Sequence, residues 1–399
     1  MKTLMILGAS ILQLPAIRKA RSMGIRVIGV DMDPYAVGMT ECDVALPIST
    51  IDIPAVVAAA KEYRIDGVMT LASDMPMRTV ARVGWELGLP AISESAAFRA
   101  TDKFAMREAL FSAGVPVPLF FAVRTYVEYQ QVVAQLGAPC WIIKPADSSG
   151  SRGVHLVSST LSVDAQERLF ADSLSYSRSG KVMVEEFMTG PEISVESLTI
   201  HGETQILAIT DKLIVGNGNF TEIGHTQPSA LPQEVQNAVC TVVKKTVQAI
   251  GIDYSPSHTE LKITPDGPKV VEIGARMGGD NITTHLVPLS TGIDMVAACI
   301  DIALGQPVKP YILKPNNAAI RYFQPPAGVI RSICGVDEAR KLPGVKEVVL
   351  LRKVGESVPQ ITSSTDRIGF VIAQGTETEN AATICERAMN MIQIEVETK

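Results

Sequence analysis

The stretch His258-Thr-Glu-Leu-Lys-Ile-Thr-Pro-Asp-Gly-Pro-Lys-Val-Val-Glu-Ile-Gly-Ala-Arg-Met-Gly-Gly-Asp-Asn281 predicts a β-hairpin. Two alternating runs flank a three-residue loop between Thr264 and Pro268, whose glycine suits the left-handed position after a type I turn. In that register Glu260 lies directly opposite Glu272. The other face is then expected to hold four apolar residues, namely Leu261, Ile263, Val271 and Ile273.

The opposed carboxylates need a positive partner. At a separation of about 5 Å they repel by roughly 3 kcal/mol at an effective dielectric constant near 20. Two hard carboxylates favour Mg²⁺ that keeps other coordination positions for phosphate oxygens. Two further interpretations stay open: a solvated hairpin whose acids point to water, or ion pairs with Lys262 and Arg276.

Length and composition describe an α/β protein of the cytoplasm. A chain of 399 residues predicts two or three domains, and 46% hydrophobic with 20% charged residues is typical of soluble proteins. The net charge of −6 argues against non-specific nucleic-acid binding. No uninterrupted apolar run has membrane-spanning length, and residues 1–20 fit a strand, turn and helix better than a signal peptide. Six scattered cysteines without a CxxC motif indicate reduced thiols: Cys42, Cys140, Cys240, Cys299, Cys334 and Cys385.

The first 95 residues alternate strands with helices, which predicts a parallel doubly wound sheet. Asp31 follows the second strand, as a ribose ligand does, but Gly8 stands alone where GxGxxG needs three glycines. We therefore interpret Gly8, Asp31 and Asp33 as a turn and a strand-end cap rather than an NAD site. The expected strands are 4–7, 26–30 and 67–71, with helices at 15–23 and 54–63.

A second group of motifs carries two lysines. Thr101 or Asp102 caps a helix that begins near Lys103, and an apolar strand ends at Lys144. The loop 147–153 that follows contains small residues, of which Gly150 and Gly153 let backbone N–H groups face an anion, and Ser148, Ser149 and Ser151 add hydroxyls. This pattern predicts a phosphate cover, with a plain hairpin tip as the alternative.

Acidic residues dominate the middle of the chain. Glu185 and Glu186 end a strand, and Glu192 begins a half-buried strand. Residues 210–219 are rich in turn formers, and 220–228 is expected to be a polar loop in which Glu222 and His225 either reach one ligand or lie exposed. Helices are expected at 232–251, 294–304 and 378–392, and strands at 318–323, 344–352 and 368–373.

In this order, Lys103, the Lys144 loop, the Glu185-Glu186 pair before Glu192 and the Glu260/Glu272 pair before Arg276 resemble the ATP-grasp superfamily. The chain looks most like its carboxylate–amine ligases, which join L-amino acids, and is less similar to carbamoyl-phosphate synthases and purine-biosynthesis members. The resemblance implies an α/β and α+β architecture. It comprises a Rossmann-like pre-ATP-grasp domain over 1–95, a two-subdomain ATP-grasp domain over 96–310 and a β-rich C-terminal subdomain over 311–399.

The resemblance also implies roles at the ATP site. Lys103 and Lys144 hold the phosphates, and Ser148, Ser149, Gly150, Ser151 and Gly153 close over them. The residues that bind adenine and ribose are Glu185, Glu186, Met188 and Glu192. Glu260 and Glu272 carry Mg²⁺ or Mn²⁺. Many relatives have Asn two residues after the second metal glutamate, where this chain has Gly274, so phosphate and water are expected to supply more of the ligands.

The resemblance also implies that Glu222 and His225 bind the amino group of the substrate. Arg276 faces the phosphoryl group and, with Lys144, is catalytic. The remaining substrate residues are His258, Gly279 and Asp280. The expected activity is ATP-dependent activation of a carboxylate, from an amino acid, as an acyl phosphate that an amine attacks; the alternative is a purine-type or carboxylase reaction with formate, bicarbonate or a ribonucleotide amine. Partners are small molecules, not nucleic acid or membrane, and a homodimer is allowed.

Overall fold

The N-terminal unit is built on a parallel sheet covered on both faces. The computed structural model describes residues 1–148, 150–216, 219–308 and 313–398. Four strands pair in parallel in the order β3-β2-β1-β4. Met5 and Leu7 pack toward one core, and Leu4 and Ile6 toward another, because successive side chains alternate between faces. The expected doubly wound sheet is confirmed; its elements are β1 (Thr3–Leu7), α1 (Leu14–Ser22), β2 (Arg26–Val30), η1 (Met39–Glu41), β3 (Val44–Leu46), α2 (Ile53–Glu62), β4 (Gly67–Met69), α3 (Pro76–Leu87) and α4 (Glu94–Thr101).

A helix from later in the chain completes this unit. Helix α10 (Met295–Ala303) packs on β4, where a Cβ at Gly67 would stand 2.3 Å from the carbonyl oxygen of Ala303. The close approach explains why this position lacks a side chain. Among the described residues, no single helix has the length and hydropathy of a membrane span. The pair Ile282–Thr291 and Met295–Ala303 has that length and hydropathy only when both helices are counted together, and the chain bends by 118° between them.

A small antiparallel sheet, in the order β5-β8-β6-β7, carries the Lys144 loop. Tyr129, Trp141 and Phe170 form its buried aromatic core. Asp102 caps α5 by accepting a hydrogen bond from the Ala105 N–H at 2.9 Å, as expected. The elements are α5 (Lys103–Ser112), β5 (Phe120–Val123), α6 (Tyr126–Leu136), β6 (Cys140–Pro145), β7 (His155–Ser158), α7 (Val163–Ser175) and β8 (Val182–Glu186).

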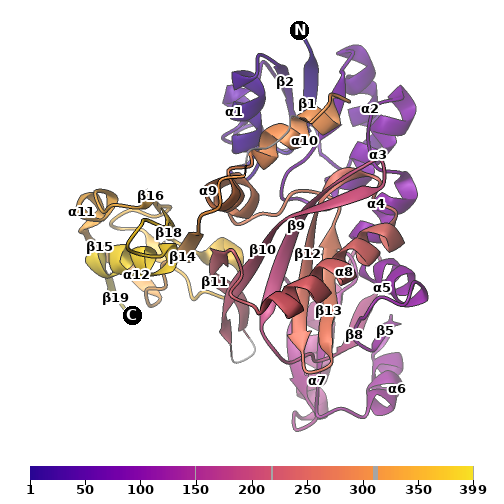
Figure 1. Ribbon diagram of the computed structural model, residues 1–399. Helices are drawn as coiled ribbons and strands as arrows, with labels where there is room; N and C mark the ends of the chain where they lie inside the picture. Colours follow the sequence, from indigo (N-terminus) through magenta and orange to yellow (C-terminus); the bar gives the residue numbers. More distant parts are fainter. Residues whose placement is uncertain (149, 217–218, 309–312, 399) are drawn as a thin grey trace.

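An eight-stranded sheet forms the centre of the molecule, in the order β13-β12-β9-β10-β11-β14-β18-β16 (Figure 1). Helix α8 covers one of its faces, where Ile193, Val195 and Leu261 share a core with Val243 and Val247. The strands are β9 (Glu192–Ile200), β10 (Glu203–Gly216), β11 (Asn219–Gln227), β12 (Tyr254–Thr264), β13 (Gly267–Gly274), β14 (Ala318–Tyr322), β16 (Val345–Leu350) and β18 (Gly369–Gln374). The helices here are α8 (Gln233–Ile250), η2 (Ile282–Leu286) and α9 (Val287–Thr291).

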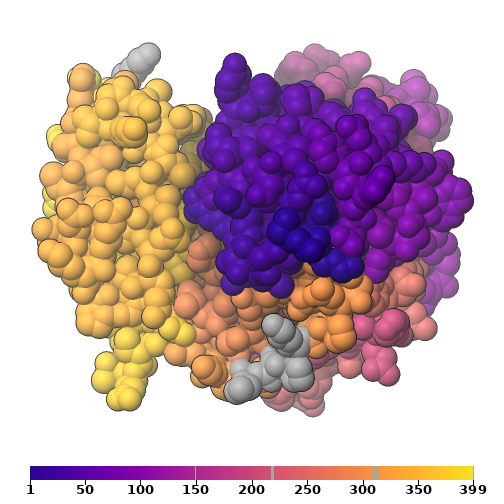
Figure 2. All heavy atoms as spheres, turned by 90° about the horizontal axis from the view of Figure 1, so that it is seen from above, coloured from indigo at the N-terminus to yellow at the C-terminus, as the bar shows by residue number. Residues whose placement is uncertain are grey.

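The last three strands of that sheet belong to the C-terminal part of the chain. Seen from above, this part lies beside the N-terminal unit (Figure 2, yellow and indigo). It has its own apolar cluster, which includes Ile330, Val371 and Ile384. Its other elements are β15 (Gly328–Cys334), α11 (Val336–Arg340), β17 (Ser357–Val358), η3 (Ser364–Asp366), α12 (Ala381–Met391) and β19 (Gln393–Glu397), with β17-β15-β19 forming a separate sheet.

The β12–β13 hairpin has the expected pairing of Glu260 with Glu272, but its loop differs from the expected one and it contains a bulge. Its loop has two residues rather than three, because Thr264 pairs with Gly267 and not with Pro268. A β-bulge between Glu260 and Leu261 then restores the register, so that Glu260 does lie opposite Glu272. The extra residue is Val271. The core position expected for Val271 is therefore taken by Val270, which is fully buried.

Candidate active site

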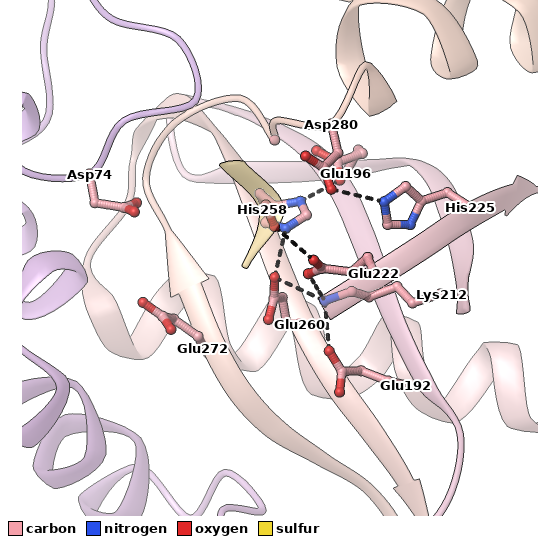
Figure 3. Close-up of polar contacts among 12 residues, drawn as sticks. Asp74, Glu192, Glu196, Lys212, Glu222, His225, His258, Glu260, Glu272 and Asp280 are labelled. Atoms are coloured by element: carbon pink, nitrogen blue, oxygen red, sulfur yellow. Dashed lines mark hydrogen bonds and ion pairs between the residues drawn. The ribbon is translucent and has the colours of Figure 1, made fainter. Parts of the chain in front are cut away.

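One face of the central sheet gathers charged side chains from neighbouring strands. Because Ile193, Val195 and Leu261 point toward α8, the residues that alternate with them point to the opposite face. This charged face lies toward the viewer of Figure 3, where the side chains converge. Its residues are Glu272 on β13, His258 and Glu260 on β12, Glu192 and Glu196 on β9, Lys212 on β10, and Glu222 and His225 on β11.

Lys103 and Lys144 lie at one end of this face, which we call the phosphate end after the ligand that the sequence predicts there. Lys103 Nζ donates to Glu272 Oε1 at 2.9 Å and to the Ser148 carbonyl at 2.7 Å. Burial opposes its charge, but Glu272 outweighs burial and raises the pKa of Lys103. Lys144 Nζ lies 2.7 Å from Glu185 Oε2, and burial lowers the pKa of Lys144 despite that partner. Both amines are thus held by carboxylates in an enclosed position.

Glu185 lies beneath Lys144 rather than on an open surface. Its carboxylate, 3% exposed, accepts from Arg107 Nε at 2.9 Å and from Lys144. Burial alone would favour the neutral acid, but the two cations lower the pKa of Glu185 to about 2. Arg107, which the sequence patterns did not single out, therefore helps to fix Lys144. Glu186 is half-exposed and accepts from the Leu119 N–H at 3.1 Å.

The loop over Lys144 has the backbone that its glycines suggest. Gly150, Ser151 and Gly153 have φ values of +72°, +58° and +68°. Asp147 fixes the base of the loop, since its carboxylate accepts from the backbone N–H groups of Arg178 at 3.0 Å and Ser179 at 2.8 Å. Ser149 lies outside the described residues. Turns with left-handed positions can expose backbone N–H groups to an anion.

Arg276 is paired with an aspartate from the N-terminal unit. Its Nε and Nη2 donate to the two oxygens of Asp74 at 2.7 and 3.0 Å. Burial opposes the charge on Arg276, but Asp74 outweighs it and raises the pKa of the guanidinium. A Cβ at Gly274 would lie 2.8 Å from Asp74 Oδ1, so the missing side chain makes room for this pair. Asp74 belongs to no motif, and the sequence offered no sign of it.

Glu260 and Glu272 fit a magnesium site completed by non-protein ligands. They are direct cross-strand neighbours, and their side chains are 26% and 29% exposed. Lys212 lies 3.2 Å from Glu260, and Lys103 2.9 Å from Glu272. Among the described residues no three His, Cys, Asp or Glu side chains are close enough to hold a metal ion. Two carboxylates with remaining positions for phosphate and water match the preference of Mg²⁺.

Lys212 and His258 bind the acids of the central strands together. Lys212 Nζ lies 2.6 Å from Glu192, 3.2 Å from Glu260 and 3.4 Å from Glu222 (Figure 3). Burial disfavours this charge, yet the three carboxylates raise the pKa of Lys212 well above its ordinary value. The lysine falls in the segment expected to be turns. An alternating-strand interpretation of that segment would have placed it on the charged face.

His258 is largely buried, and its expected contact with the substrate stays a prediction. Its Nδ1 lies 2.5 Å from the fully buried Glu196, and its Nε2 lies 3.3 Å from Glu260. Burial disfavours the imidazolium, but Glu196 and Glu260 raise the pKa of His258 to about 9. A Cβ at Gly278 would stand 2.6 Å from His258 Nδ1, so this glycine accommodates the ring. His258 thus positions Glu260 from behind.

The expectation of a polar loop over 220–228 is wrong. This segment is strand β11, paired with β10 and β14. On a regular strand, residues three apart face opposite sides. A bulge lets Lys212 pair with His225 and Ile214 with Glu222, so that Glu222 and His225 face the same side as Lys212. Local sequence patterns do not reveal such a bulge.

Glu222, His225 and Asp280 form the other end of the face, which we call the amino end after the substrate amino group that the sequence predicts there. Asp280 Oδ2 accepts from His225 Nε2 at 3.2 Å and lies 2.9 Å from Arg367 Nη1. The second terminal nitrogen, Nη2, donates to Glu222 Oε2 at 3.0 Å. The guanidinium carbon stands 4.0 Å from the centre of the Tyr322 ring. Arg367 and Tyr322 come from the C-terminal part and were not anticipated. Gly279 precedes Asp280, close to Ala72 of the N-terminal unit.

Comparison with known proteins gives two family matches. Residues 136–285 match an ATP-grasp domain, and residues 321–397 match the second C-terminal domain of L-amino acid ligases. An uncharacterised protein, y4rH, of Sinorhizobium fredii is 31% identical over 342 residues, which cover 83% of this chain and 68% of that protein. The alanine–anticapsin ligase of Bacillus subtilis is 27% identical over 63% of this chain, and this chain spans only 56% of its length.

Solved structures extend the fold likeness to the whole chain. The L-amino acid ligase from Bacillus licheniformis superposes with a TM-score of 0.82, covering 100% of this chain and 99% of that one. The sequences are 22% identical, so this match concerns the fold. It includes the C-terminal part, which supplies Arg367 and Tyr322.

Proposed function

This chain belongs to the ATP-grasp ligases, and we propose that it joins the carboxylate of an amino acid to an amine with release of ADP and phosphate. The observation that carries the proposal is the continuity of the charged face. Its phosphate end has two enclosed lysines and an arginine, and its amino end has carboxylates suited to an ammonium group. Lys212 and Glu260 link the two ends.

The phosphate end suits phosphoryl transfer. A carboxylate oxygen of the substrate attacks the γ-phosphorus of ATP, the bond to the β–γ bridging oxygen breaks, and ADP leaves. Lys103, Lys144 and Arg276 exchange their carboxylate partners for phosphate oxygens, which spreads the developing charge over fixed donors. Glu260 and Glu272 would hold Mg²⁺, which supplies charge neutralisation at the phosphates when bound. The 147–153 loop covers the acyl phosphate and excludes water.

The amino end suits the substrate's ammonium group. Among the described residues, Glu222 Oε1 has only the 3.4 Å contact with Lys212, so it can accept from a second cation. His225 donates a hydrogen bond to Asp280 and so orients the carboxylate of Asp280 beside this acceptor. The incoming amine then attacks the acyl carbon, and the carbon–oxygen bond to phosphate breaks. The amine loses a proton, and the products are an amide and inorganic phosphate.

A panel assay tests the function. ADP release with Mg²⁺ is measured for the twenty L-amino acids, singly and in pairs, and products are identified by mass. We expect ADP release that depends on an amino acid, with an equimolar amide product. Release stimulated by bicarbonate, formate or a ribonucleotide amine, with amino acids inert, would replace this proposal by a purine-type or carboxylase reaction.

A further inference from the structure

Arg367 occupies an unusual place for a residue of the C-terminal part. It lies between η3 and β18, yet its side chain is 5% exposed and reaches into the amino end. There it bridges two carboxylates from different segments, Glu222 on β11 and Asp280 after β13. Ser364 Oγ and the face of Tyr322 hold the guanidinium from its other sides. Arg367 is therefore fixed in position before any substrate binds.

The bridge sets the charge of the amino end. The carboxylates of Glu222 and Asp280 and the guanidinium of Arg367 sum to one negative charge. Lys212 offsets only part of the Glu222 charge, because it lies closer to Glu192 and Glu260 than to Glu222. Asp280 Oδ1 has no hydrogen-bond partner among the described residues, and its side chain is 27% exposed. Together with Glu222 Oε1 it leaves acceptors for one further cation.

Arg367 also carries a buried donor that is unpaired within the described residues. Its Nε, like Nδ1 of the neighbouring His225, is buried without a hydrogen-bond partner in the described part of the chain. Unpaired buried polar atoms cost stability and are uncommon in folded proteins.

We infer that Arg367 is a specificity-determining residue that restricts the activated substrate to amino acids carrying a single positive charge. The inference rests on the proposed function. One substrate ammonium neutralises the amino end. A second cation in the substrate side chain meets the guanidinium of Arg367 in a site with little water to screen the repulsion. Neutral or acidic side chains meet no such penalty.

The test measures how well each amino acid serves as the substrate whose carboxylate is activated. Hydroxylamine replaces the amine and converts the acyl phosphate to a hydroxamate with release of phosphate. Three pairs matched in side-chain length are compared: norvaline with 2,4-diaminobutyrate, norleucine with ornithine, and 2-aminoheptanoate with lysine, all in the L form. The preference is scored on the pair whose neutral member forms hydroxamate fastest. We expect wild type to favour the neutral member at least tenfold in kcat/KM.

The variants separate charge from packing. Arg367→Met keeps the length and loses the charge, so the neutral preference should fall at least tenfold. Arg367→Lys should retain the preference within threefold. Arg387→Met is the matched control, because Arg387 is an exposed residue on α12 paired with Glu379. If Arg367→Met does not fold, Asp280→Asn serves instead, and should strengthen the neutral preference by removing a negative charge.

Failure of this inference can be told apart from failure of the proposed function. Equal use of both pair members by wild type, or an unchanged preference in folded Arg367→Met, overturns the inference while leaving the ligase activity standing. An unchanged preference in Asp280→Asn does the same. If no amino acid supports hydroxamate formation in wild type, the proposed function itself is wrong.

Discussion

The two ends of the charged face are built on different principles. At the phosphate end each cation has essentially one carboxylate partner: Lys103 with Glu272, Lys144 with Glu185, and Arg276 with Asp74. At the amino end the partners are shared, since Arg367 contacts two carboxylates and Lys212, which links the two ends, contacts three. A single pair can open when a ligand replaces one partner. A shared network keeps its shape when a ligand is added.

This difference matches what the proposed function requires each end to bind. ATP brings several negative charges, so the phosphate end must release cations from their carboxylates. An amino acid brings one ammonium group, which the amino end can accept without rearrangement. Substitutions should therefore affect nucleotide and amino-acid binding separately, and the following predictions use that separation.

Glu272→Gln should have the largest effect, a fall in kcat of roughly 1,000-fold with the fold retained. The amide keeps the volume of the side chain but removes one of two metal carboxylates and the partner of Lys103. ADP release and thermal unfolding are measured side by side. Glu203→Gln, at the exposed start of β10, is the matched control. Near-native ADP release by Glu272→Gln in Mg²⁺ would refute the metal assignment.

Lys144→Ala should weaken nucleotide binding by roughly 100-fold, because truncating one partner of a buried charge pair typically costs about 2 to 5 kcal/mol. Amino-acid binding should change less than threefold, since the amino end contains no contact to Lys144. Calorimetry with a non-hydrolysable ATP analogue and with the amino acid gives both constants. Lys244→Ala, on the exposed surface of α8, controls for loss of a lysine. Equal losses for both ligands would argue against phosphate contact.

Glu222→Gln should raise KM for the amino acid at least tenfold, or about 1.4 kcal/mol, with KM for ATP unchanged. The substitution removes the charge that attracts the ammonium group and keeps a hydrogen-bonding group beside Arg367. Amino acid is titrated at saturating ATP, with Glu234→Gln on α8 as the exposed control. An unchanged KM for the amino acid would remove Glu222 from the binding site.

The smallest expected effect is on stability in acid. The pKa of Glu185 falls from an ordinary 4.5 to about 2 in the folded protein, so its stabilisation is fully present above pH 4.5. It is lost as the pH falls from 4.5 toward 2. The free-energy advantage of wild type over Glu185→Gln, measured by denaturant unfolding between pH 6 and 3, should shrink by about 1 to 2 kcal/mol. A constant advantage across this range would mean that Glu185 is not held ionised.

The sequence predicts the phosphate end better than the amino end, for a physical reason. Strand alternation and a turn signal were enough to set Glu260 opposite Glu272, even though a shorter loop and a bulge produce that register. Lys103 follows its helix cap, and Lys144 ends its strand, so both belong to local patterns. Local patterns depend on neighbours in the chain, and a single sequence contains those neighbours.

The amino end depends on contacts between distant segments. Arg367 lies 145 residues from Glu222 along the chain, and no motif surrounds it. Segment 210–228 contains Gly, Asn, Asp and Thr, which favour turns, but pairing with β9 and β14 makes it two long strands. Asp74 likewise comes from the N-terminal unit to meet Arg276. Tertiary pairing, rather than local propensity, decides these positions.

The central claim is that the carboxylate itself receives the γ-phosphoryl group. It is tested most directly by labelling both carboxylate oxygens of the accepted amino acid with ¹⁸O and analysing the phosphate released in a single turnover. Attack of the carboxylate on ATP carries one labelled oxygen into the acyl phosphate, and cleavage of its carbon–oxygen bond leaves that oxygen on phosphate. We predict one ¹⁸O per inorganic phosphate formed. Phosphate free of ¹⁸O, with amide product formed, would contradict the account.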